Sequence, residues 1–154
     1  MKKIKTTTTN IVDRIIILFL PMIIGVGGVV LLHLLLPGFS ISDDVGLEIV
    51  KSIFDVWGIL LGFVITAVSI LLTANRNELV ETLIATNHMQ SIIFSYITAS
   101  AYLLIAIVYA LVLLIFQMWT KNLCNIFIAL NIVIIFSVGI SIYFLFVIIF
   151  KMNK

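Results

Sequence analysis

The sequence predicts an all-α polytopic membrane protein, and three observations point to this fold class. The chain of 154 residues is 63% hydrophobic and 10% charged, whereas a soluble domain contains about 25% charged residues. Its apolar residues form four runs of about 20 residues, the length that crosses a hydrocarbon core of about 30 Å. Its polar residues lie mainly in short segments between these runs. Because a backbone in lipid must satisfy its own hydrogen bonds, we expect each run to be a helix.

The four predicted spans make up one transmembrane domain, residues 1–154, and cover residues 15–36, 54–74, 92–116 and 126–150. A polar segment, residues 1–10, is expected to precede the first span. Within that span, Pro21 and the glycines that follow it predict a kink, which serves either helix packing or a gating hinge. Pro37-Gly38 predicts the end of the first helix.

The segment between the first two spans is acidic and begins with Ser42, a predicted N-cap. The helix dipole favours acids in the turn that follows. We expect a short amphipathic helix at the outer interface before the second span, separate from it or continuous with it, with Trp57 as its aromatic anchor. The acids of this segment are Asp43, Asp44 and Glu48. They either favour cations at the mouth of a pore or are ordinary solvated residues that cap the helix.

A stripe of small, polar and charged residues follows the second span and extends to the residues just after it. Its members recur at steps of three or four, which places them on one face of a helix. The remaining faces are apolar, so the stripe must face something other than lipid. Either copies of it surround a narrow hydrated path in a homo-oligomer, or it is a tightly packed helix interface. The stripe consists of Asp55, Gly58, Gly62, Thr66, Ser69, Thr73 and Arg76.

The third span carries a second, weaker polar stripe, which we expect to pack on the first. Its tyrosines need partners for their hydroxyl groups inside the membrane. In the fourth span, Asn131 is expected to bond to a neighbouring helix. The second stripe consists of Ser95, Thr98, Tyr102 and Tyr109.

Lysines and arginines predict the orientation, because they are in excess on the cytoplasmic side of membrane proteins. With the N-terminus on the cytoplasmic side, Lys51 and Lys121 are the only two of these basic residues that fall on the outer side. Both termini are then cytoplasmic, and we expect a multi-pass protein of the bacterial inner membrane. The connection 75–90 is its largest cytoplasmic surface, where a partner would act. The inner bases are Lys2, Lys3, Lys5, Arg14, Arg76, Lys151 and Lys154.

Several functional classes are not indicated by any motif in this chain. It has no glycine-rich phosphate loop, no HExxH and no clustered cysteines. We therefore expect no enzyme activity, no metal site and no cofactor. The net charge of +2 reflects the bias towards the inner face rather than a site for nucleic acid. Substrate-coupled transport would usually require an ionisable residue near mid-membrane. We place none there.

The order of these features resembles a known family. The segment Pro37 to Ser42 (PGFSIS) after the first span, and the stretch from Gly58 to Arg76, are similar to the RexB-type four-span membrane proteins of the phage-lambda exclusion system. The resemblance implies an abortive-infection effector. A cytoplasmic sensor protein detects the phage, the membrane protein lets ions pass, and the cell loses its membrane potential. The alternative is a non-conducting immunity or scaffold protein whose stripe binds a partner.

Overall fold

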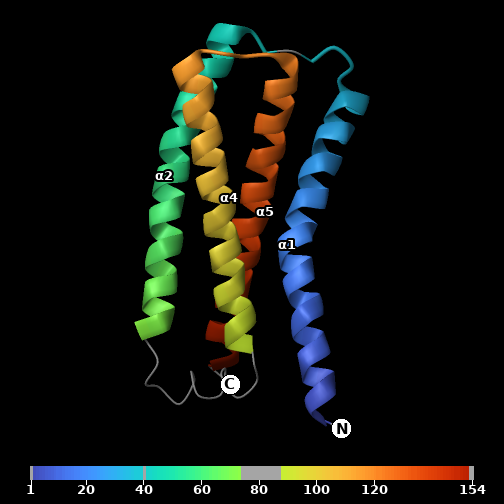
Figure 1. Ribbon diagram of the computed structural model, residues 1–154, viewed down its shortest axis with the longest axis vertical. Helices are drawn as coiled ribbons and strands as arrows, with labels where there is room; N and C mark the ends of the chain where they lie inside the picture. The colour runs from blue at the N-terminus through green and yellow to red at the C-terminus, as the bar shows by residue number, and fades with distance from the viewer. Residues whose placement is uncertain (1, 40, 74–87, 153–154) are drawn as a thin grey trace.

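The computed structural model describes residues 2–39, 41–73 and 88–152. Within these ranges the chain forms helices and turns without a strand: α1 (Lys2–Leu35), α2 (Asp43–Thr73), α4 (His88–Phe116) and α5 (Lys121–Met152). The helices lie side by side in an elongated bundle, with both ends of the chain at the same end of it (Figure 1). Each is long and apolar enough to cross a membrane. The predicted all-α, four-span fold is therefore confirmed.

α1 begins earlier than the sequence analysis expected, and α2 takes one of the two forms left open. α1 is helical from Lys2, so the polar segment 1–10 belongs to the helix rather than preceding it. α2 runs without a break from Asp43 to Thr73, so the amphipathic segment is continuous with the second span. No proline interrupts the chain from Asp43 to Thr73, which allows the ladder of backbone hydrogen bonds to continue. The N–H of Gly46 donates to the carbonyl of Ser42 at 2.8 Å, which places Ser42 at the predicted N-cap.

The predicted end of the first helix is correct. α1 ends at Leu35, and Pro37-Gly38 turns the chain towards α2. Gly38 has a φ of 97°, a left-handed conformation that glycine adopts without a steric penalty. The N–H of Phe39 donates to the carbonyl of Leu36 at 3.1 Å, which closes the turn.

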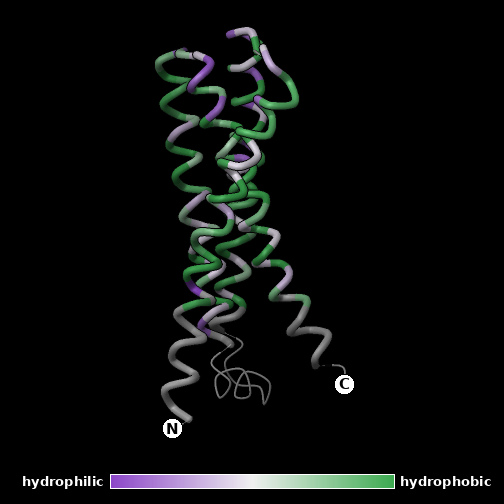
Figure 2. The backbone as a smooth tube through the Cα atoms, turned by 90° about the vertical axis from the view of Figure 1, so that its right-hand side faces the viewer, coloured by the Kyte–Doolittle hydropathy of each residue, from purple (hydrophilic) through white to green (hydrophobic). Residues whose placement is uncertain are grey.

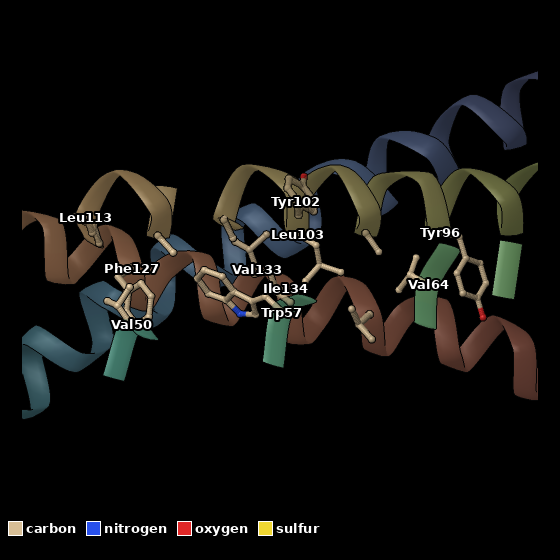
Figure 3. Packing of buried hydrophobic residues seen from close by; sticks show 14 of the residues in the cluster. Val50, Trp57, Val64, Tyr96, Tyr102, Leu103, Leu113, Phe127, Val133 and Ile134 are labelled. Carbon is tan, nitrogen blue, oxygen red and sulfur yellow. The ribbon is translucent and has the colours of Figure 1, made fainter. Parts of the chain in front are cut away.

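α4 is the central helix of the bundle and contacts α1, α2 and α5. One row of its buried residues alternates in steps of four and three, the spacing of a coiled-coil seam. α2 meets α4 with Val50, Trp57 and Val64, which are buried at steps of seven (Figure 3). α1 packs mainly on α5. The seam of α4 consists of Ile92, Tyr96, Ala99, Leu103, Ala106, Ala110 and Leu113.

Trp57 is a core residue, so the prediction of an interfacial anchor is wrong. Its side chain is only 2% exposed. The indole packs on Phe127 of α5 with ring centroids 5.5 Å apart (Figure 3). Val50 and Val64 lie one heptad before and after it, and this apolar row turns Trp57 into the bundle. An indole at the membrane interface and an indole in a helix seam have the same local sequence pattern.

Two glycines of α1 allow a close approach to α5. A methyl group at Gly25 would lie 2.5 Å from Cγ2 of Val133, and one at Gly28 would lie 2.6 Å from Cδ1 of Ile132. Gly27, by contrast, has no neighbour within 4 Å of such a methyl group. Small residues at these positions let helix backbones pack closely in a membrane. The contacts of Gly25 and Gly28 favour the packing interpretation of the proline–glycine region.

Candidate functional site

The first polar stripe lies on the outside of the bundle. Its members from Asp55 to Ser69 are exposed, whereas the row containing Trp57 on the same helix is buried. A methyl group at Gly58 or Gly62 would meet nothing within 4 Å. The interpretation of this stripe as a helix interface within one chain is therefore wrong. What remains open is contact with water, with a second copy of the chain or with another protein.

The hydroxyl groups of the stripe bond to their own helix. Oγ1 of Thr66 donates to the carbonyl of Gly62 at 2.8 Å. Oγ of Ser69 donates to the carbonyl of Ile65 at 2.9 Å. Because both hydroxyls donate their hydrogen bond to a carbonyl of α2, the side of the helix around Thr66 and Ser69 is only weakly polar. It can contact either water or another helix.

The polar face of α2 extends beyond the predicted stripe towards the start of the helix. Glu48, Lys51 and Ser52 are exposed there, and their spacing places them on the same side as Asp55. From Glu48 to Ser69 the face covers about 32 Å at 1.5 Å per residue. That length is comparable to the hydrocarbon core of a bilayer, about 30 Å. Hereafter "the α2 face" means residues 48, 51, 52, 55, 58, 62, 66 and 69.

The start of α2 lies beside the turn between α4 and α5. A methyl group at Gly46 would lie 2.2 Å from Cε2 of Trp119, so the backbone of α2 touches this indole. Asp55 lies two and a half helical turns beyond Gly46, about 13 Å further along the helix axis. Asp55 therefore lies well beyond the first turns of α2, which begins at Asp43.

Apolar side chains cover the outside of α4, the neighbouring helix. Ile115 and Val108 of α4 are 72% and 58% exposed. Figure 2 shows that hydrophobic positions dominate the helices, while many hydrophilic positions gather near the end where α1 leads into α2. Asp55 lies within the 28-residue stretch Asp43–Ile70 of α2 that is long and apolar enough to cross a membrane.

The other residues of the predicted site have different positions. The acids Asp43, Asp44 and Glu48 are exposed on the first turns of α2. Thr73 is the last residue of α2. Arg76 and most of the predicted cytoplasmic connection 75–90 lie outside the described residues.

The second stripe faces α1 and α5 rather than the α2 face, so that part of the prediction is wrong. Ser95, Thr98 and Tyr102 are buried. The Tyr102 hydroxyl donates to the carbonyl of Leu18 in α1, and that of Tyr109 donates to the carbonyl of Leu123 in α5, the latter at 2.9 Å. The tyrosines therefore have hydroxyl partners, as expected. α2 instead packs on the heptad row of α4, which is more apolar.

The polar contacts of Asn131 and Arg14 were not predicted from the sequence. Nδ2 of Asn131 donates to the carbonyl of Phe127 at 2.9 Å, within its own helix, so the expected bond to a neighbour is not made. Nη2 of Arg14 donates to Oε1 of Gln90 at 3.0 Å. The guanidinium also lies 5.6 Å from the ring centroid of Phe94. The sequence marked Arg14 only as an inner base, whereas it also joins α1 to α4.

The residues that the structure describes contain no group of three or more His, Cys, Asp or Glu side chains able to hold a metal ion. Comparison with protein-family models, with curated proteins and with solved structures finds no match to this chain. The fold defines a multi-pass membrane protein with four candidate spans. Its distinguishing feature is the α2 face, a polar surface on the outside of an apolar bundle.

Proposed function

We propose that copies of this chain assemble in the membrane around their α2 faces and form a gated, ion-permeable pore. The observation that supports it is the position of Lys51 and Asp55, exposed on a helix that is long and apolar enough to cross a membrane. Charged residues within spans nearly always face a bundle interior or a water-filled cavity. In the part of one chain that the structure describes, the residues of the α2 face are exposed, whereas several copies around a common axis would enclose them.

The gate in this proposal is hydrophobic. Ile59 and Phe63 lie beside the glycines of the α2 face and are 74% and 54% exposed. Apolar constrictions close pores by excluding water from a narrow segment. A small rotation of α2 in each copy would turn Ile59 and Phe63 away from the axis of the pore and bring Gly58, Gly62 and Thr66 towards it. The pore then opens without any change in the fold of the single chain.

In the cell, the pore would depolarise the inner membrane as a defence against phage, triggered by a cytoplasmic sensor protein. The resemblance to RexB-type proteins supports this role. The bases of the sequence support cytoplasmic termini, and both ends of the chain lie at one end of the bundle (Figure 1). The sensor would act on that side, where α2 ends and α4 begins.

A second candidate is a non-conducting immunity or scaffold protein whose α2 face binds a partner helix. The specific observation in its favour is the open space at Gly58 and Gly62. Glycines four residues apart let a second helix approach closely in lipid. The hydroxyls of Thr66 and Ser69 bond to their own helix, so such a contact need not contain water.

Membrane potential separates the two candidates. A potential-sensitive dye is followed in cells that produce this chain alone, or together with the product of the neighbouring gene, before and after phage challenge. A pore predicts depolarisation that requires the partner or the phage. An unchanged potential under every condition, with the chain shown to be in the membrane, would contradict the pore and favour the partner-binding protein.

A further inference from the structure

The charges on the α2 face alternate in sign along one side of the helix. Glu48 is acidic, Lys51 is basic and Asp55 is acidic, and all three side chains are exposed. A face of one sign would repel an identical face on a second copy. An alternating face is instead complementary to itself when two copies lie parallel, because the base of one can meet the acid of the other.

We infer that a second copy of this chain covers part of the α2 face, with Lys51 of one chain paired to Asp55 of its neighbour. This inference rests on the assembly in the proposed function and names the contact that holds it together. The pair would lie beside the path for ions. It would supply the counter-charge that Asp55 needs at its depth in the membrane, since charges within spans pair with one another or line cavities.

The geometry of parallel helices allows this pair. All copies insert in the same direction, so equivalent residues lie at the same depth. Lys51 and Asp55 are then offset by roughly 6 Å along the axis. The flexible four-carbon stem of lysine can span such an offset. Gly58 and Gly62, which have open space around them, follow within two turns and let the two backbones approach closely.

A pair within one helix is the competing arrangement, because Lys51 and Asp55 are also four residues apart on the same face. Charge reversal can separate the two. A chain with Lys51→Asp carries two acids at these positions, and a chain with Asp55→Lys carries two bases. Neither can form the pair within itself or with an identical copy. A mixture of the two restores the pair only between chains.

The experiment uses full-length chains bearing two different affinity tags, solubilised from membranes in mild detergent. Native chains should co-purify through either tag. Each reversal alone should lower co-purification about tenfold or more, because like charges then meet within the membrane. The mixture of Lys51→Asp with Asp55→Lys should restore it. Equal amounts of each variant in the membrane fraction establish that the chains insert. Lys121→Asp, at the exposed start of α5, is the matched control and should co-purify like the native chain.

Two results would overturn the inference while leaving the pore proposal intact. One is co-purification of each reversed chain at the native level. The other is loss in both single variants without recovery in the mixture, which would place the pair within one chain. If native chains did not co-purify at all, the assembly itself would be absent, and the proposed function would fail together with this inference.

Discussion

Replacing Gly62 by leucine is expected to abolish the depolarisation caused by this protein while the chain still inserts into the membrane. Gly62 is exposed, and an added side chain has no neighbour within 4 Å in its own chain. The fold of one chain therefore accommodates leucine. In the proposed assembly, every copy would place an isobutyl group in the same narrow layer, and an apolar constriction excludes water and ions. The measurement is the dye response under the condition in which native chains depolarise the cell.

Gly27→Leu is the matched control for this prediction. Gly27 is also an exposed glycine of a membrane-crossing helix with no neighbour within 4 Å, but it lies on α1. We expect Gly27→Leu to depolarise cells like the native chain. If Gly62→Leu depolarises cells as strongly as the native chain at equal abundance in the membrane, the α2 face does not line the path for ions. Loss of depolarisation in both variants would mean that glycine as such, rather than its position, matters.

Replacing Gly46 by alanine is expected to destabilise the bundle by about 1–3 kcal/mol, the usual cost of overpacking. The new methyl group would lie 2.2 Å from the Trp119 indole, so α2 or the indole must shift. The indole is itself held edge-on against Phe127, with ring centroids 6.0 Å apart. The measurement is the free energy of unfolding of the purified protein, from a denaturant titration in detergent micelles.

Gly58→Ala is the control within the same helix, because its methyl group meets nothing within 4 Å. We expect its free energy of unfolding to rise by about 0.5–1 kcal/mol, the gain in helix propensity from glycine to alanine. In a Trp119→Ala background, Gly46→Ala should cost much less, because the group it meets is gone. An equal cost in both backgrounds would show that Gly46 does not act through Trp119.

The sequence was sufficient for the fold class because the lipid solvent leaves few alternatives. Runs such as Ile92 to Phe116 can only be helices in a membrane. Pro37-Gly38 is a strong signal for a turn and therefore for the end of the helix. The error in the start of the first helix has a simple cause. The polar residues before the first span suggested a separate segment, but no residue there breaks a helix.

Which side of α2 packs inside could not be predicted, because the two faces give conflicting local signals. A row of glycine, serine and threonine is typical of tight packing, and Trp57 near a span end is typical of the interface. The structure reverses both roles. The position of Asp55 relative to the turn between α4 and α5 was equally hidden, because it depends on the contact between Gly46 and Trp119, residues that are far apart in the sequence.

The central claim, that the α2 face is in contact with water inside the membrane, can be tested by thiol chemistry. Cys124 is the single cysteine of the chain, so Cys124→Ala provides a background without thiols. Gly58→Cys lies about 18 Å beyond Gly46 along α2, and Val108→Cys serves as the control on the exposed side of α4. Cells in the depolarising state are treated with a charged, membrane-impermeant thiol reagent. We predict that Gly58→Cys is modified and that its modification blocks depolarisation, whereas Val108→Cys does not react. An unreactive Gly58→Cys, or equal reaction at both positions, would contradict the account.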